Sequence, residues 1–551
     1  MLSALETAQP DVMLSPSLPP EPVVAAIDVG TNSIHMVLVR IDSQIPSFRI
    51  IDRVKETVRL GEYCNQTGAL TEAAMQRSYQ ALARFLTIAG SHHPHAVIAV
   101  ATSAVREAPN GYEFLHRVQE GLGLTVDLIS GAEEARRIYL GVLSAMELDQ
   151  KPHVVMDIGG GSTELILGDG REPDFLRSIK VGAVRLTQQF LASDPPAPKD
   201  FVALQDYVRG MVEGPVDRIK QLLEGNPVRM VGTSGTIETL VAQAARQLDQ
   251  NPNHLHGYDL SRQSVTEFLH LIKEMPLKDR LKIPGLVERR AEIVVAGAVI
   301  LHEVMTLLDA PHLTYCTRAL REGLIVDWML TQGLIEDRLR YQSSVRQRHV
   351  LKLAHKYHVE MPYTERVADF ALSLFDQTQG ILHQWGMPER ELLWAAAILH
   401  NSGHFISHGS HHKHSYYLIR HGELLGYNEE EVEIIANLAR YHRKSPPKKK
   451  HENFQNLPLE QHRQMVLELS PLLRLASALD RRRIHSIQSL TCSFSPNVNS
   501  PKGMTLLLEP THPDDDCALE MWSLMQKKDV FEQQFKMLLE IKTMDPSDVQ
   551  S

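Results

Sequence analysis

Two segments of the chain share one pattern: an apolar run that ends in Asp, a turn that contains Gly, and a second apolar run. VVAAIDVGTNSIHMVLV begins at Val23, and HVVMDIGGGSTELILG begins at His153, about 130 residues later. Apolar runs on both sides of a Gly turn are typical of two strands joined tightly. The recurrence of this unit predicts a duplicated α/β domain with a cleft between its halves.

The segments between and after these units continue the α/β pattern. Residues 48–60 read as a third strand, 71–90 as a helix, and 95–108 as strand, turn and helix. Residues 124–146 read as a strand followed by a helix with an acidic first turn, which suits the helix dipole. PVRMVGTSGTIETLVAQAA, residues 227–245, is a further strand, Gly turn and helix. We therefore expect a first domain over 23–135 and a second over 136–325.

Length and composition bound the class of protein. A chain of 551 residues is too long to fold around a single hydrophobic core. Its contents of 43% apolar and 23% charged residues are ordinary for a globular protein. The net charge of −10 gives no global field that would attract nucleic acid, so a polyanionic ligand needs a local basic channel. The four cysteines are scattered without a CxxC pair, which favours a reducing cytoplasm without disulfides or zinc: Cys64, Cys316, Cys492 and Cys517.

The N-terminal segment and the longest apolar runs are where a targeting or membrane signal would lie. Residues 1–22 carry five prolines and lack a basic start followed by an apolar core, so they read as a disordered tail and not as a signal peptide. No apolar run approaches the ~20 residues of a membrane-spanning helix. We expect a cytoplasmic protein without membrane contact.

The Gly turns suit phosphate binding. Gly lets backbone N–H groups approach an anion because no Cβ intervenes, and adjacent hydroxyls add donors. A single DxGT turn is more simply a tight strand connection, but two copies plus GTSGT favour phosphate. The expected phosphate-binding residues are Gly30, Thr31, Asn32, Ser33, Gly159, Gly160, Gly161, Ser162, Thr163, Gly232, Thr233, Ser234, Gly235 and Thr236.

Acidic residues at the strand ends can hold a divalent cation. Asp157 and Glu164, with Asp28 as a third candidate, are the expected ligands for Mg²⁺, which prefers carboxylates and phosphate oxygens. Mn²⁺ is an alternative, and a monovalent cation is a further candidate cofactor.

A carboxylate in the first turn of the helix in SGAEEARRIY could activate water beside bound phosphate. Glu133 and Glu134 are both candidates for this general base, and either could instead only complement the helix dipole. Arg106, in TSAVREA, is the expected phosphate clamp, because a guanidinium matches phosphate oxygens; a surface salt bridge is the alternative.

Beyond about residue 335 the pattern changes. Helical periodicity dominates residues 335–490, as in RVADFALSLFDQ and EEVEIIANLARYH. The last part, 491–551, reads as a small α/β appendage, with β-like runs at 489–494, 503–509 and 517–524 and one helix at 530–544. The chain is thus expected to form paired α/β domains, an all-α domain and an appendage.

These blocks together resemble a known family. AAIDVGTNSIHMVLV, VATSAVREA, SGAEEARRIYLGV, DIGGGSTELILG and VGTSGTIETL are similar, in order, to the blocks of the exopolyphosphatase/guanosine pentaphosphate phosphatase (Ppx/GppA) family. The resemblance implies two RNase H-like domains of the actin, Hsp70 and sugar kinase superfamily around a cleft. It also implies that Glu134 is the catalytic base, and that the protein is a homodimer.

The helical part resembles an HD-type domain that has lost its metal site. Tyr363 stands where the first His of such a site would fall, and His400-Asn401 replaces His-Asp, while Asp480 is retained. Phenol and amide groups are poor substitutes at a metal centre, so no HD hydrolase activity is expected. The dense run of His404, His408, His411, His412 and His414 could bind a metal, but solvated or phosphate-facing histidines are the commoner outcome.

Clustered basic residues in the helical part are candidates for a polyanion track that leads to the cleft. A solvated basic loop is the alternative, and no interleaved aromatics support nucleic acid. The candidates are Arg440, Arg443, Lys444, Lys448, Lys449, Lys450, Arg481, Arg482 and Arg483.

The leading functional hypothesis is a processive exopolyphosphatase that hydrolyses the terminal phosphoanhydride of inorganic polyphosphate. Hydrolysis of guanosine pentaphosphate (pppGpp) to tetraphosphate by the same site is the close alternative. A small-molecule kinase is less consistent with Glu134 and with the lack of a recognisable acceptor motif. A non-enzymatic sensor of polyphosphate or nucleotide is disfavoured by the intact set Glu134, Asp157 and Glu164.

Overall fold

A computed structural model describes most of the chain. The described residues are 21–42, 46–62, 67–247, 255–335, 345–422, 424–457, 459–494 and 503–544. Most of the predicted tail at 1–22, and Cys64, lie outside them. Among the described helices none is both long and apolar enough to cross a bilayer.

The first α/β domain is built on a five-stranded sheet in the order β3-β2-β1-β4-β5. Strand β1 reads VVAAIDV and is almost entirely buried, as expected of a central strand covered on both faces. It pairs antiparallel with β2 and parallel with β4. The strands are β1 (Val23–Val29), β2 (Ser33–Asp42), β3 (Ser47–Thr57), β4 (Ala96–Ala101) and β5 (Asp127–Leu128).

The second α/β domain repeats this topology in a six-stranded sheet in the order β10-β11-β9-β6-β7-β8. Its central strand β6 pairs antiparallel with β7 and parallel with β9, as β1 pairs with β2 and β4. The strands are β6 (His153–Ile158), β7 (Thr163–Gly168), β8 (Phe175–Ile179), β9 (Met230–Thr233), β10 (Asp259–Ser261) and β11 (His312–Tyr315). The predicted duplication is confirmed.

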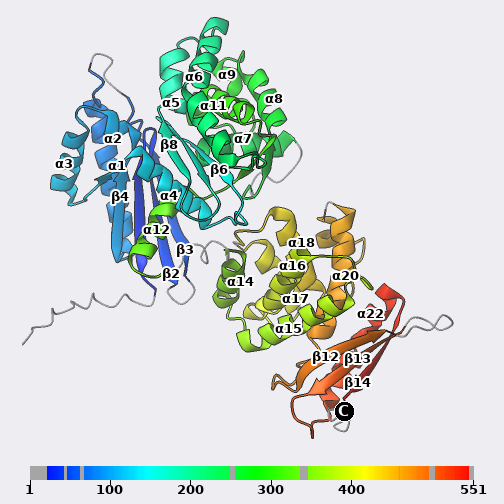
Figure 1. Ribbon diagram of the computed structural model, residues 1–551. Helices are drawn as coiled ribbons and strands as arrows, with labels where there is room; N and C mark the ends of the chain where they lie inside the picture. The colour runs from blue at the N-terminus through cyan, green and yellow to red at the C-terminus, as the bar shows by residue number, and fades with distance from the viewer. Residues whose placement is uncertain are drawn as a thin grey trace, which may run out of the picture.

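Helices cover both sheets (Figure 1). Those of the first half are α1 (Glu72–Ser91), α2 (Ser103–Glu107), α3 (Gly111–Leu122) and α4 (Gly131–Leu143). Those of the second half are α5 (Ala183–Phe190), α6 (Pro198–Leu223), α7 (Ser234–Gln247), α8 (Arg262–Ile272), α9 (Leu277–Arg280), α10 (Glu288–Ala291), α11 (Val294–Leu307) and α12 (Leu320–Thr331).

Helices α4 and α12 join the two halves in one core. Their apolar side chains pack with residues of β1 and β2 and with Val155 of β6 and Ile166 of β7. The two helices cross so closely that a Cβ on Gly323 would lie 1.7 Å from the carbonyl oxygen of Arg137. The predicted domain boundaries at 135 and 325 both fall inside these two helices.

The helical part and the appendage form a separate lobe in the ribbon view (Figure 1), and Lys352 of the first helix of this lobe donates to the Phe48 carbonyl of β3 at 2.9 Å. The helices are α14 (Val345–Lys356), α15 (Met361–Thr378), α16 (Met387–Leu399), the 3₁₀ helix η1 (Ser402–Phe405), α17 (His411–Arg420), α18 (Glu429–Tyr441), α19 (Glu452–Gln455) and α20 (Glu460–Ala476). The appendage has β12 (Ile487–Phe494), β13 (Gly503–Pro510), α21 (Ala518–Met525), α22 (Lys528–Phe535) and β14 (Leu538–Thr543).

Two local predictions in the appendage were wrong. Residues 517–524 were expected as a β-like run but form α21, whose buried residues Glu520, Ser523 and Leu524 follow helical spacing. The helix expected over 530–544 ends at Phe535, because Lys536 adopts a left-handed φ of 51°. The remainder forms β14, which alternates exposed and buried residues and pairs parallel with β13.

Candidate active site

The two Gly turns meet face to face between the domains. Gly30 N–H donates to the Ser33 carbonyl at 3.2 Å, and Gly159 N–H donates to the Ser162 carbonyl at 2.9 Å, so both hairpins close in the same way. A Cβ on Gly161 would lie 2.5 Å from Ser103 Oγ and 2.9 Å from Thr31 Oγ1. The absent side chain at Gly161 therefore lets the turn of one domain approach the turn of the other.

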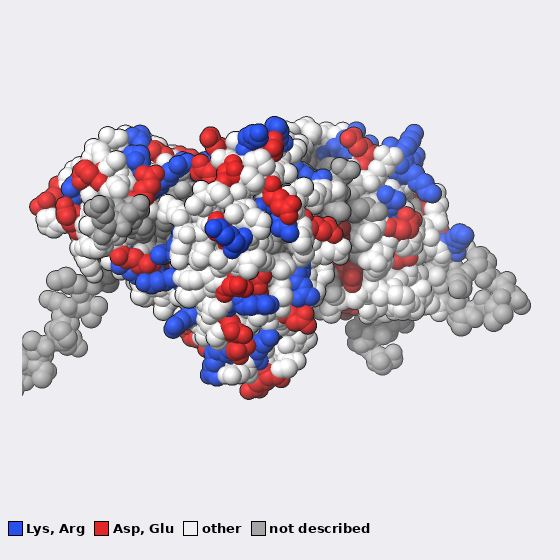
Figure 2. Space-filling model, turned by 90° about the horizontal axis from the view of Figure 1, so that it is seen from above, with Lys and Arg blue, Asp and Glu red and all other residues white. Residues whose placement is uncertain are grey.

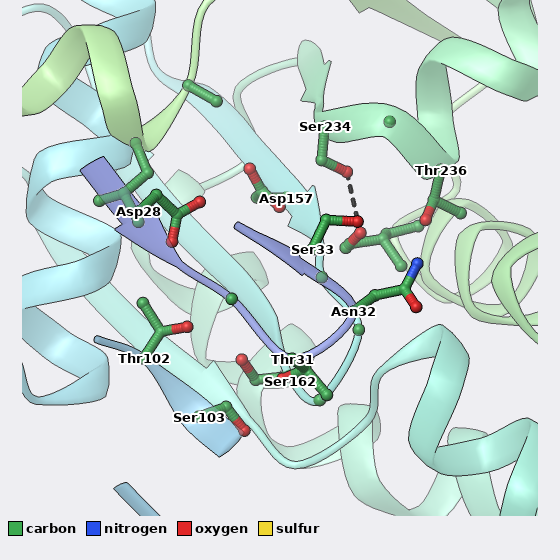
Figure 3. Close-up of a pocket in the computed structure, with 18 of the residues that line it drawn as sticks. Asp28, Thr31, Asn32, Ser33, Thr102, Ser103, Asp157, Ser162, Ser234 and Thr236 are labelled. Atoms are coloured by element: carbon green, nitrogen blue, oxygen red, sulfur yellow. Dashed lines mark hydrogen bonds between the residues drawn. The ribbon is translucent and has the colours of Figure 1, made fainter. Parts of the chain in front are cut away.

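Between these turns lies a cavity of about 160 Å³, called here the catalytic cavity. Figure 3 shows hydroxyl and amide groups of Thr31, Asn32, Ser33 and Ser162 around it, with Asp28 and Asp157 on another side. The Ser234 hydroxyl donates to the Ile158 carbonyl at 2.8 Å, which fixes the GTSGT turn to the second Gly turn (Figure 3). The arrangement presents short polar groups and backbone to a compact ligand.

Most of the predicted site residues line this cavity. They are Asp28, Gly30, Thr31, Asn32, Ser33, Glu134, Asp157, Gly159, Gly160, Gly161, Ser162, Glu164, Ser234, Gly235 and Thr236.

Three predicted phosphate-binding residues are not brought to the cavity. Thr163 is fully buried and its hydroxyl donates to the Val181 carbonyl at 2.5 Å. Thr233 is buried and donates to the Arg318 carbonyl at 2.9 Å. Gly232 packs against Leu313 of the neighbouring strand. These residues stabilise the sheet, because the two threonine hydroxyls already donate to backbone carbonyls and Gly232 packs inside the domain.

Helix α4 places the carboxylates of Glu133 and Glu134 in different surroundings. Ser130 caps this helix by accepting a hydrogen bond from Glu133 N–H at 3.1 Å. The Glu133 carboxylate is paired with Arg136 and Arg137 at 2.7 Å. Glu134 is 7% exposed and lines the cavity. Of the two, only Glu134 can approach a water molecule beside a bound phosphate.

Arg106 lies beside Glu134 instead of lining the cavity. Its guanidinium donates to Glu134 at 3.1 Å and to the Ile129 carbonyl at 2.8 Å. In this arrangement Arg106 orients the carboxylate, and its role as a phosphate clamp stays a prediction.

Four carboxyl groups share the acidic side of the cavity, namely Asp28, Glu134, Asp157 and Glu164. Burial and the neighbouring Glu134 raise the pKa of Asp157 to about 7, and burial and Asp157 raise that of Glu164 to about 8. Burial raises the pKa of Asp28 to about 6. Burial and Glu164 raise the pKa of Glu134 well above its usual range. The acids repel one another, so they favour protons or cations.

This acidic side fits a divalent cation. Asp28 Oδ1 is buried without a hydrogen-bond partner, and carboxylate oxygens are the donors that Mg²⁺ prefers. No three His, Cys, Asp or Glu side chains of the described chain are placed to enclose a metal by themselves. Mg²⁺ commonly binds through one or two carboxylates, with water and substrate phosphate completing its coordination. Asp28, Asp157 and Glu164 remain the residues that would hold it.

The lining of the cavity also includes a group of cationic residues, which the sequence did not indicate. His35, Lys55, Arg290 and Arg321 line the cavity and also line an adjoining space of about 230 Å³, called here the basic chamber. Burial and the neighbouring Arg290, Arg289 and Arg321 lower the pKa of Lys55 to about 8. Arg289 and Arg290 are adjacent in the sequence, but no motif indicated that they would lie beside these residues of β2, β3 and α12.

The predicted polyanion track is partly neutralised in the structure. Arg482 bonds Asp515 and Glu520, and Arg483 pairs with Glu360. Arg443 donates to His411 Nδ1 at 3.0 Å. The three exposed lysines, Lys448, Lys449 and Lys450, keep their charges at the surface. Figure 2 shows acidic and basic side chains intermixed on the face it presents, without a broad surface of one sign.

The residues compared above with an HD site do lie together. The rings of Tyr363 and His400 have their centroids 5.8 Å apart, and Arg483 lies over Tyr363 at 4.5 Å. Asp480 is buried, and its Oδ2 accepts a hydrogen bond from Arg366 Nε at 2.8 Å. The Arg366 guanidinium therefore occupies Oδ2 of the retained acid, while Oδ1 is buried without a hydrogen-bond partner.

The His-rich run packs on itself and on a neighbouring histidine. The rings of His404 and His411 have their centroids 4.0 Å apart, and Nε2 of His411 lies 3.3 Å from Nε2 of His442. Burial lowers the pKa of His411 to about 3 and that of His412 to about 4. These rings are therefore neutral near pH 7, which suits packing among themselves.

Comparison with known proteins places this geometry in context. Residues 37–332 match the Ppx/GppA phosphatase family, and residues 345–528 match Ppx/GppA phosphatase, domain III. The chain is 31% identical over 481 residues to a guanosine-5'-triphosphate,3'-diphosphate pyrophosphatase of Pseudoalteromonas atlantica, which covers 86% of this chain and 89% of that protein.

Solved structures match the fold. An exopolyphosphatase from Cytophaga hutchinsonii is 29% identical, with a TM-score of 0.52 over 56% of this chain and 98% of its own. A Ppx/GppA family member from Aquifex aeolicus is 30% identical, with a TM-score of 0.49 over 57% of this chain and 99% of its own. The Cytophaga structure and the two family matches confirm the expected paired α/β domains of the actin-like superfamily, followed by a helical domain.

Proposed function

The chain belongs to the Ppx/GppA phosphatase family and is an enzyme, and on this premise we propose that it hydrolyses the terminal phosphoanhydride of inorganic polyphosphate. The observation that carries the proposal is a cavity lined by both carboxylates and cations. Such a cavity can hold a phosphate chain by the cations and place its terminal phosphate beside the carboxylates.

Glu134 is the proposed general base. Its raised pKa suits a group that takes a proton from water near neutral pH. The water oxygen forms a bond to the terminal phosphorus as the bridging P–O bond breaks. The shortened chain leaves with the bridging oxygen, and the added oxygen departs in orthophosphate. Arg106 holds the Glu134 carboxylate in position at 3.1 Å.

Backbone N–H groups and hydroxyls of the two Gly turns bind the terminal phosphate in this proposal. Positioning and charge stabilisation supply most of the rate in phosphoryl transfer. Mg²⁺, held by Asp157 and Glu164 with Asp28, would neutralise the charge that develops on the phosphate oxygens.

The residues that line the cleft favour a chain of phosphates as the substrate over a nucleotide. Lys55, Arg290 and Arg321 provide repeated positive charges in the basic chamber, which suit successive phosphates. The described residues that line the catalytic cavity and the basic chamber include no Phe, Tyr or Trp on which a base could stack.

Hydrolysis of pppGpp is the second candidate, and the Pseudoalteromonas relative favours it. That relative is named for the nucleotide and matches nearly the whole chain. The presence of the helical extension therefore does not by itself indicate polyphosphate. A homodimer, expected from the family resemblance, stays a proposal.

Release of orthophosphate from long-chain polyphosphate and from pppGpp, measured in parallel with Mg²⁺, tests the proposal. We expect a higher kcat/KM for the polymer. A higher kcat/KM for pppGpp would assign the second function. Release from neither substrate would contradict both.

A further inference from the structure

A second space adjoins the catalytic cavity on another side. It has a volume of about 360 Å³ and shares Thr31, Asn32 and Ile293 with the catalytic cavity. It shares no lining residue with the basic chamber, so the two spaces adjoin different parts of the cavity lining. We call it the side chamber. Its walls come from the end of the first Gly turn, from α5 and from the segment around α9.

The side chamber and the basic chamber differ in how their cations are partnered. In the side chamber, Arg59 pairs with Glu292 at 3.1 Å and Arg280 pairs with Asp194 at 2.9 Å. In the basic chamber, cations outnumber carboxylates, because Arg53, Lys55, Arg290 and Arg321 share the single lining carboxylate Glu238. A surplus of buried cations retains an anion, whereas arginines that are each paired with a carboxylate attract it less.

We propose that the side chamber is the passage by which orthophosphate leaves the catalytic cavity while the remaining polymer stays in the basic chamber. The proposal rests on the proposed polyphosphatase function. A processive hydrolase keeps its substrate in the entrance after each cleavage, so the small product needs another way out. The side chamber begins at the turn that binds the terminal phosphate, and each of its two arginines is paired with a carboxylate, so it attracts the product less than the basic chamber does.

Helix α5 offers a matched pair of substitutions to test the passage. Gln188 and Gln189 are adjacent and exposed, but only Gln188 lines the side chamber. Ala192, in the following loop, is exposed and lines it too. The double variant Gln188→Trp/Ala192→Trp fills the chamber, and Gln189→Trp is the control.

Steady-state orthophosphate release is measured from long-chain polyphosphate and from tripolyphosphate. We expect the double variant to lose about fivefold or more in turnover of the long chain, because product release becomes limiting. Its turnover of tripolyphosphate should stay within about twofold, because the short pyrophosphate remnant leaves and opens the entrance to orthophosphate. Gln189→Trp should match the wild type on both substrates.

Equal turnover of the long chain by the double variant and the wild type would contradict the proposed product passage. Equal loss on both substrates would overturn it too, since a damaged fold or site affects both. A wild type inactive on the polymer but active on pppGpp would instead refute the proposed function on which the inference rests.

A second variant tests the chamber without filling it. Glu292→Gln leaves Arg59 without its acid, so the chamber should hold orthophosphate more tightly. We expect inhibition by added orthophosphate at several-fold lower concentration than in the wild type. Unchanged inhibition would count against the side chamber as the product path.

Discussion

The catalytic cavity and the retained acid of the helical domain handle buried charge in opposite ways. In the cavity four carboxyl groups lie together, and burial with mutual repulsion raises their pKa values. In the helical domain Asp480 is bonded to Arg366, and burial lowers the pKa of the adjacent His400 to about 4. A group of buried carboxyls that outnumbers its cationic partners indicates a place for a ligand, whereas a single carboxylate bonded to a guanidinium indicates a structural role.

The largest effect on turnover is expected for Glu134→Gln, at the acidic side of the cavity. The amide keeps the shape but cannot accept the proton from water, so turnover should fall on the order of 10²–10⁴-fold with substrate binding retained. Glu133→Gln is the matched control, because Glu133 is bonded to Arg136 and Arg137 outside the cavity. Both variants are compared by orthophosphate release and by binding of polymer. Turnover of Glu134→Gln near that of the wild type would remove it as the base.

The buried carboxyl groups of the cavity should give the protein an unusual dependence of stability on pH. Asp157 and Glu164 have pKa values of about 7 and about 8 when folded, above their usual values of 3.8 and 4.5. The folded state keeps protons that the unfolded chain releases, so without Mg²⁺ the free energy of unfolding falls as pH rises from about 4 to 8. Each unit of pKa difference corresponds to about 1.4 kcal/mol.

Melting temperatures between about pH 5 and pH 9, with and without Mg²⁺, measure this effect. Mg²⁺ should stabilise the protein more at the higher pH, because it replaces protons on the same carboxylates. Asp157→Asn should flatten the pH dependence and weaken the effect of Mg²⁺. A stabilisation by Mg²⁺ that does not change with pH would contradict this interpretation of the acidic side.

The exposed lysines test whether the helical domain guides the polymer. Replacing Lys448, Lys449 and Lys450 by Gln should raise KM for long-chain polyphosphate about threefold at low salt, because surface charges steer a polyanion. Activity on tripolyphosphate should not change. The triple variant of the exposed Lys199, Lys220 and Lys278 in the second α/β domain removes the same charge elsewhere. If the two triple variants raised KM equally, the change in KM would result from net charge and not from the position of the lysines on the helical domain.

The smallest effect is expected at the altered HD position. Asn401→Ala should leave turnover within about twofold of wild type, since a neutral amide there is a poor metal ligand. Turnover and bound metal are measured on the same preparation. Loss of both would show that the helical domain holds a working metal centre.

Residues whose roles depend on local pattern were predictable. The two hairpin turns, Asp28 and Asp157 at strand ends, and the acidic start of α4 were read from turn chemistry and periodicity, and the structure brings them to one cavity. The appendage was less predictable. Residues 538–543 continue an apolar pattern from α22, and only pairing with β13 makes them a strand.

The sequence by itself determined the duplicated strand-turn-strand units and the acids they carry, because strand period and Gly turns are local properties. The contacts between distant segments set which charges are matched by an opposite charge. Lys55, Arg290 and Arg321 come from distant segments and gather in the basic chamber, while Arg482 and Arg483, adjacent in a basic run, are each paired with acids. Whether a charge is matched depends on its neighbours in space, which only the tertiary structure decides.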